Sequence, residues 1–137
     1  MTDDVREALR AIDQLMSQAA PYEEVRAALD ACAALPGAES ILPGLAQRRL
    51  ATTTLYQRSD DECEQELRLL LNVERELMRR TMAVLSACKD RPRLLAKYMP
   101  ELIDELDQAA VTDSALSGPL EFARKALERI QRDPPRG

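Results

Sequence analysis

Residues 59–89 read SDDECEQELRLLLNVERELMRRTMAVLSACK, and this stretch decides the fold class. Ser59 followed three positions later by Glu62 is a capping box, a pairing that starts helices. Apolar side chains then recur at helical spacing, at Leu67, Leu70, Leu71, Leu77, Met78, Met82, Leu85 and Cys88. Such spacing is typical of one face of an amphipathic helix. The stretch predicts a single helix over residues 60–89, about 30 residues and roughly 45 Å long.

The sequence on either side of this stretch is also helical in pattern. Before it, we expect helices over residues 3–19, 21–35 and 42–57, with Pro36-Gly37 ending the second. After it, Pro92 and Pro119 each suit the first turn of a further helix, the last of which ends before Pro134. The expected fold is all-α, a five- or six-helix bundle or an array of helical hairpins with one long helix.

The composition favours helices within one domain. The chain has 137 residues, of which 45% are hydrophobic but only 3% aromatic, so Ala, Leu, Met and Val must fill the core. These residues, with Glu, Arg and Gln, are strong helix formers, and few β-branched runs are available for strands. A chain of this length fits one core better than two. We expect a single helical domain over residues 1–133 and a short C-terminal tail over residues 134–137.

The chain contains no histidine, and this excludes several kinds of site. Histidine phosphotransfer, Glu-x-x-His metal centres and Ser-His or Cys-His nucleophile pairs all need that residue. Cys32, Cys63 and Cys88 lack C-x-x-C spacing, and the four glycines form no phosphate-binding loop. We therefore expect no enzymatic activity, no cofactor, no metal site, and reduced thiols that are mostly buried.

Two acidic clusters form the candidate partner-binding face. Their residues are Asp60, Asp61, Glu62, Glu64 and Glu66 in the first cluster, and Glu101, Asp104, Glu105 and Asp107 in the second. Because carboxylates can occupy a basic groove meant for phosphate, such a face would suit an inhibitor of a nucleic-acid-processing enzyme or toxin. The alternative is that both clusters are solvated, the first also complementing the positive end of a long helix.

One enzymatic alternative rests on Glu101-x-x-Asp104, which puts two acids on one helical face and could hold magnesium. This arrangement resembles the paired acidic helices of all-α nucleotide pyrophosphohydrolases. The resemblance implies a Mg-dependent hydrolase with a second acidic pair in the earlier helix. That family has Glu-x-x-Glu there, whereas this chain has Asp61-x-x-Glu64 and a longer gap between the pairs. The pyrophosphohydrolase is therefore a remote alternative.

A basic segment over residues 79–97 supports a second functional class. Its candidate contacts are Arg79, Arg80, Arg91, Arg93 and Lys97. Arg79 and Arg80 precede the last turn of the predicted helix, where the helix dipole explains them poorly, so the segment could contact phosphates in a nucleoprotein complex. The net charge of −5 and the scarcity of aromatic residues beside these cations disfavour nucleic acid as the partner.

The predicted long helix changes sign along its length, from acidic at residues 60–76 to basic from residue 79 onward. This polarity favours antiparallel pairing of two copies as a homodimer, and ion pairs within one chain are the alternative. Neither a signal peptide nor an apolar run near ~18 residues is present, so we expect a cytoplasmic protein without membrane contact. The preferred function is a non-enzymatic protein-interaction module, an adaptor, regulator or inhibitor.

Overall fold

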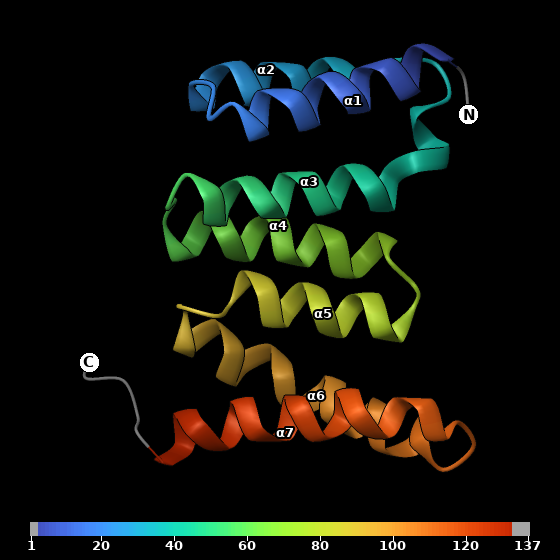
Figure 1. The fold of residues 1–137 in the computed structure, drawn as a ribbon, viewed down its shortest axis with the longest axis vertical. Helices are drawn as coiled ribbons and strands as arrows, with labels where there is room; N and C mark the ends of the chain where they lie inside the picture. The colour runs from blue at the N-terminus through green and yellow to red at the C-terminus, as the bar shows by residue number, and fades with distance from the viewer. Residues whose placement is uncertain (1–2, 133–137) are drawn as a thin grey trace. The chain divides into compact units, whose positions relative to one another are not determined.

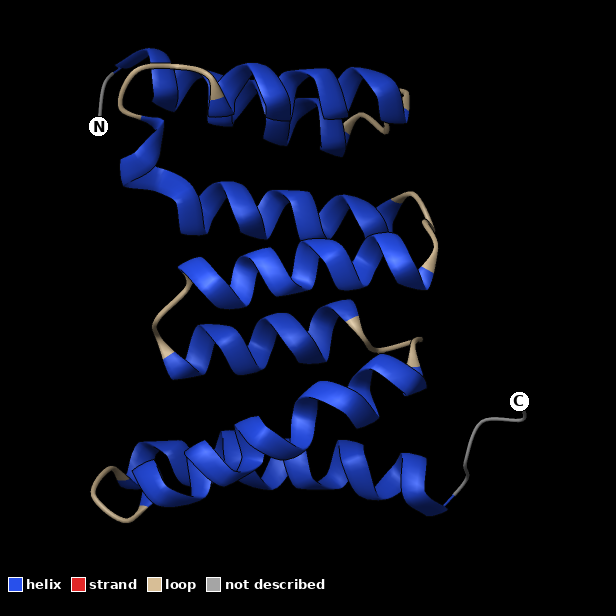
Figure 2. Cartoon of the chain, turned by 180° about the vertical axis from the view of Figure 1, so that it is seen from behind, coloured by secondary structure: helices blue, strands red, loops and turns tan. Residues whose placement is uncertain are grey.

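The structure is a computed structural model that describes residues 3–132, and in this part of the chain it contains helices and no strand (Figure 2). The first helices are α1 (Asp3–Ser17), α2 (Tyr22–Ala33), the 3-10 helix η1 (Ala38–Ile41), α3 (Leu42–Leu55) and α4 (Asp60–Val73). They are followed by α5 (Leu77–Ala87), α6 (Pro92–Ala110), the 3-10 helix η2 (Ser114–Leu116) and α7 (Ser117–Arg132). The predicted all-α class is confirmed. The expected number of five or six helices is wrong, because residues 3–132 form seven α-helices and the stretch predicted as one helix over residues 60–89 contributes two of them. The arrangement as a bundle or an array of helical hairpins stays a prediction.

The chain divides into two compact units, which we describe one at a time. Unit 1 is Met1–Val73 and contains α1 to α4; unit 2 is Glu74–Gly137 and contains α5 to α7. Whether both fold together as the single domain predicted over residues 1–133 stays a prediction. The predicted tail, residues 134–137, lies outside the described residues.

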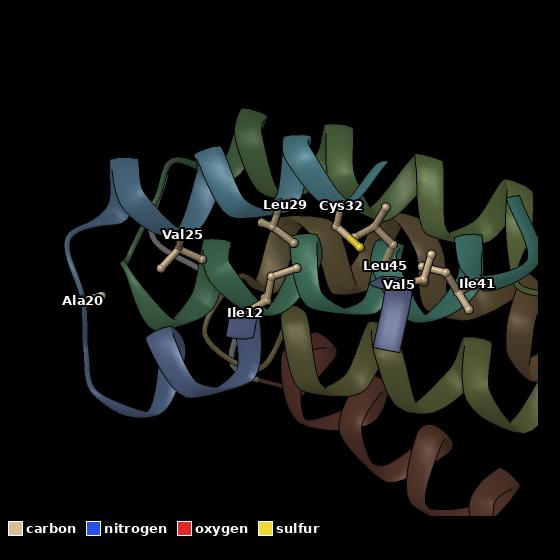
Figure 3. Packing of buried hydrophobic residues seen from close by; sticks show 8 residues of the cluster. All are labelled: Val5, Ile12, Ala20, Val25, Leu29, Cys32, Ile41 and Leu45. Atoms are coloured by element: carbon tan, nitrogen blue, oxygen red, sulfur yellow. The ribbon is translucent and has the colours of Figure 1, made fainter. Parts of the chain in front are cut away.

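In unit 1, consecutive helices are neighbours: α1 packs on α2, α2 on α3, and α3 on α4 (Figure 1). The core beneath the first three helices is a cluster of apolar side chains (Figure 3). It comprises Val5, Ile12, Ala20, Val25, Leu29, Cys32, Ile41 and Leu45. Arg48 also joins α3 to α1, because its Nε and Nη2 donate to the two carboxylate oxygens of Asp13 at 2.8 and 2.9 Å.

In unit 2, α6 packs against both α5 and α7. Its buried face repeats at three- and four-residue steps, through Leu95, Met99, Leu102 and Leu106. Pro100 lies inside α6, and the helix continues past it to Ala110. The core of unit 2 therefore depends on the apolar stripe of α6, the helix that the sequence predicts to begin at Pro92.

The single helix predicted over residues 60–89 is wrong, because α4 ends at Val73 and α5 begins at Leu77. No Pro or Gly lies between them. Glu74 is only 4% exposed, and its Oε1 accepts a hydrogen bond from the backbone N–H of Glu76 at 3.2 Å. Such a local bond to the backbone competes with helical hydrogen bonds. The homodimer stays a prediction, but the long helix that supported it is absent.

Two further expectations concern the cysteines and the membrane. Cys32, Cys63 and Cys88 are free and buried, as predicted. Burial raises the pKa of the Cys32 thiol, which keeps it protonated and unreactive as a nucleophile. Among residues 3–132, no helix has the length and apolar character needed to cross a membrane.

Candidate functional site

The first acidic cluster lies on α4 in unit 1, and part of it is already engaged. The N-cap half of the predicted capping box forms, since the N–H of Glu62 donates to Ser59 Oγ at 3.2 Å. The Glu62 carboxylate accepts from Arg58 Nε and Nη2 at 2.8 and 3.1 Å, which holds its pKa below the ordinary value. Glu64 pairs with Arg68 at 3.4 Å. Glu62 and Glu64 therefore form ion pairs within the chain.

The other members of this cluster differ in exposure. Asp60 and Asp61 are exposed at the start of α4. Glu66 turns its Oε2 into the protein, where this atom is buried and no hydrogen-bond partner for it is present among the described residues. Partner binding through the whole acidic cluster stays a prediction. The exposed members of the cluster lie in the first turn of α4.

The second acidic cluster lies on α6 in unit 2. Glu101, Asp104 and Asp107 are exposed, Glu105 is half-buried, and Asp107 pairs with Arg124 of α7 at 3.0 Å. Among the described residues, no group of three or more Asp, Glu, Cys or His side chains is placed to hold a metal ion. The two acidic pairs that a pyrophosphohydrolase would need thus fall in different units, and neither forms such a group.

The basic segment lies in unit 2 and spreads along the α5–α6 pair. Arg79 and Arg80 belong to the first turn of α5, whereas Arg91 is the residue before the first turn of α6 and Arg93 lies in that turn. Seven residues separate Arg80 from the end of α5, roughly 10 Å along the helix. Arg79 pairs with Glu76 at 3.2 Å, and Lys97 lies 5.6 Å from the ring of Tyr98. The structure does not gather these cations at one point, and phosphate binding stays a prediction.

A polar pocket lies among α2, α3 and α4 in unit 1, and sequence reasoning missed it. Its lining residues are Tyr22, Arg26, Leu29, Arg49, Thr52, Thr53, Glu62, Gln65 and Glu66. Arg26 Nη1 donates to the Tyr22 hydroxyl at 3.0 Å, and this bond is the first cause of the raised pKa of Arg26. The Arg58 guanidinium lies 4.1 Å from the centre of the Tyr22 ring. Tyr22 is thus the hub of a network joining α2 to α4.

The space inside this polar pocket is small, about 20 Å³. A single water molecule needs roughly 10–15 Å³ of such space. The buried Oε2 of Glu66 would be a natural acceptor for that water. The polar pocket therefore has room for a bridging water and no room for an organic ligand, which makes it a structural feature.

An apolar groove lies between the start of α3 and the end of α4, also in unit 1. We call it the α3/α4 groove, and it is lined by Leu42, Leu45, Ala46, Arg49, Leu69, Asn72 and Val73. Its volume is about 180 Å³. Leu42 is 41% exposed and Leu69 53% exposed, while Leu45 and Ala46 at its floor are buried. Large apolar side chains thus remain in water beside a hollow that could receive others.

Three consecutive leucines in the sequence indicate this groove, although helical periodicity alone does not. Leu69, Leu70 and Leu71 are consecutive, and a helix can turn only part of such a run toward one core. Leu67 and Leu70 face inward and are fully buried, so Leu69 is left outward. Pro43 lies within the first two positions of α3, so Leu42 is at the start of that helix. This end of α3 faces the part of α4 that contains Leu69.

The α3/α4 groove is the candidate functional site of unit 1. Compared with protein-family models, curated proteins and solved structures, the chain has no significant match to any of them.

Proposed function

We propose that this chain is a non-enzymatic protein-interaction module, an adaptor, regulator or inhibitor, that binds a partner protein through the α3/α4 groove. The observation that carries the proposal is the pair of exposed leucines, Leu42 and Leu69, that flank the groove. Burying apolar surface yields about 25 cal/mol per Å². A partner side chain that enters the groove would therefore bury apolar surface, its own and that of the two leucines.

The dimensions of the groove favour a protein partner over a small molecule. Pockets that enclose drug-sized ligands have volumes of roughly 300–1,000 Å³. The α3/α4 groove, at about 180 Å³, is smaller than this range and is open at its surface. It suits one or two side chains presented by a partner helix, the mode in which an amphipathic helix lies in an apolar groove.

The architecture of unit 1 supports this role. In this proposal, α1–α2 and α3–α4 act as a helical-hairpin array, a rigid scaffold that holds Leu42 and Leu69 at a fixed separation. The exposed acids at the start of α4, Asp60 and Asp61, would contribute to steering of a basic partner rather than to its anchoring. We place the site of action in the cytoplasm, because three free thiols suit a reducing compartment.

The proposal is tested by capturing the partner from extracts of the native cells with the immobilised full chain. Leu69→Asp should weaken the complex by about 30-fold, the effect of one interface hot spot. Leu55→Asp is the matched control, since Leu55 is 49% exposed in the same unit but does not line the groove. The proposal is wrong if Leu69→Asp and Leu55→Asp retain the partner equally well.

A second pair of variants separates the groove from the acidic surface predicted from the sequence. Asp61→Lys and the double change Glu101→Lys with Asp104→Lys alter exposed acids without touching the groove. We expect these variants to keep the partner and to slow its association two- to threefold at most, as surface charges usually do. Loss of the partner in these variants, with retention in Leu69→Asp, would assign binding to the acidic clusters instead.

A further inference from the structure

We propose that the segment filling the α3/α4 groove is an amphipathic helix that carries one carboxylate beside its apolar face, and that this carboxylate binds Arg49. The inference rests on the proposed function and names the chemistry of the partner. It follows from the charge of the groove, from the geometry of Arg49 and from the direction of the two helices that form the groove.

The charge of the groove is opposite to that of the chain. The chain as a whole has a net charge of −5. Of the described residues that line the groove, Arg49 alone is charged, and none is a carboxylate. A positive side chain at the edge of an apolar hollow favours an acidic group there and disfavours a basic one. The lining of the groove therefore presents one cation, which is paired with the exposed Asp30, on a chain of net negative charge.

Arg49 keeps hydrogen-bonding capacity for such a group. Its Nη2 donates to Asp30 at 2.9 Å, whereas the guanidinium group has five N–H donors. The Arg49 side chain is 20% exposed and that of Asp30 is 63% exposed. Because the Asp30 side chain is well solvated, water can replace Arg49 as its hydrogen-bond partner. Arg49 is less exposed, so an ion pair with a new carboxylate would be screened less than a pair in open solvent.

The antiparallel helices α3 and α4 provide a channel for a third helix. Leu42 and Leu69 stand on its two sides, and Arg49 lies two turns along α3 from Leu42. A helix in such a groove uses apolar anchors at positions i, i+3 or i+4, and i+7. A second copy of this chain fits less well, because pairing groove with groove would bring two Arg49 side chains together without a carboxylate in either lining.

The test is a selection of displayed helical peptides on the full chain, with binding of the best peptide then measured by fluorescence anisotropy. We expect enrichment of peptides with an apolar i, i+3 or i+4, i+7 pattern and an Asp or Glu at one fixed register. Their binding should fall about 30-fold in Leu69→Asp and remain unchanged in Leu55→Asp. Changing the peptide's acid to its amide should cost about tenfold.

Two protein variants test the contact with Arg49 itself. In Arg49→Gln, the acidic and amide peptides should bind equally, whereas Arg48→Gln, the matched loss of a neighbouring arginine outside the groove, should keep the tenfold difference. Asp30→Asn removes the competing carboxylate and should strengthen the acidic peptide about threefold. A gain of affinity cannot be produced by misfolding, so this variant tests the inference even where Arg49→Gln is unstable.

The possible failures are distinguishable. If selected peptides depend on Leu69 but show no preferred acid, or bind Arg49→Gln and wild type alike, the carboxylate inference is wrong and the groove remains a binding site. If no selected peptide depends on Leu69, both the inference and the proposed function fail. If sedimentation shows a dimer that Leu69→Asp dissociates, a second copy fills the groove and the inference is overturned.

Discussion

The polar pocket and the α3/α4 groove of unit 1 share Arg49 but differ in how their side chains are satisfied. In the polar pocket, Tyr22, Arg26 and Glu62 engage one another or Arg58 through hydrogen bonds and ring contacts. In the groove, Leu42 and Leu69 remain in water. Polar groups that find partners inside the chain stabilise its fold, whereas apolar groups left in water are available to another molecule.

This difference separates the two regions by the quantity that each should control. Changes in the polar pocket should alter the free energy of unfolding, because they break contacts within unit 1. Changes at Leu42 or Leu69 should alter partner binding and leave the free energy of unfolding nearly constant. The comparison breaks if either region controls both quantities.

Among changes to the polar pocket, the largest effect on stability is expected for Tyr22→Ala. This change removes the hydrogen bond from Arg26, the stacking of Arg58 and the ring contact with Tyr56, whose ring centre is 5.6 Å away. Since Tyr22 is half-buried, we expect a loss of about 2 kcal/mol in the free energy of unfolding, less than for a buried aromatic residue. Urea unfolding followed by circular dichroism measures it. A loss below about 0.5 kcal/mol would mean that the network is not structural.

A smaller loss is expected for Tyr22→Phe, which keeps the ring and removes the hydroxyl that accepts from Arg26 Nη1. The stacking of Arg58 on the ring should survive. A hydrogen bond of this kind contributes about 1 kcal/mol, so the variant should be about 1 kcal/mol less stable than the wild type in the same urea experiment. A loss equal to that of Tyr22→Ala would show that the hydroxyl, and not the ring, holds the network.

The sequence predicts most helices of this fold well, because the spacing of apolar residues along each segment indicates which face of the helix is buried. Val5 and Ile12 lie in the helix predicted over residues 3–19, and Leu102 and Leu106 lie in the helix predicted to begin at Pro92; all four are buried. The break between α4 and α5 is different: it lies where the backbone N–H of Glu76 donates to the side chain of the buried Glu74, a bond that competes with helical hydrogen bonds. The helical pattern of the sequence on both sides of residues 74–76 does not reveal that bond.

The candidate site was hidden for a related reason. The acidic and basic clusters are visible in the sequence as runs of charge, and the i,i+4 spacing of Arg58 with Glu62 and of Glu64 with Arg68 is visible there too. The α3/α4 groove combines residues from the start of one helix and the end of the next. Only the antiparallel packing of α3 on α4 brings Leu42 near Leu69, and no local pattern specifies that contact.

On the groove side of the comparison, Leu69→Ser should change the free energy of unfolding by less than about 0.5 kcal/mol, as exposed positions usually do. Leu67→Ala, two residues earlier on α4, is the contrast: Leu67 is fully buried, and its truncation should cost about 2–5 kcal/mol. Both values come from urea unfolding of the full chain. A cost above about 1 kcal/mol for Leu69→Ser would show that this leucine packs within the fold and is not reserved for a partner.

The smallest effect concerns the pH dependence of the polar network. Arg58 holds the pKa of Glu62 below its ordinary value of 4.5 in the folded chain. The unfolded chain therefore binds the proton first as the pH falls, so the contribution of Glu62 to stability is present above pH 4.5 and is lost below it. Glu62→Gln should lose part of the wild type's decline in stability between neutral pH and acid, measured as the melting temperature at a series of pH values.

Leu69→Ser should keep that decline unchanged, because the groove contains no carboxylate among its described lining residues. A parallel pH dependence in Glu62→Gln and the wild type would show that the Arg58–Glu62 pair does not stabilise the fold.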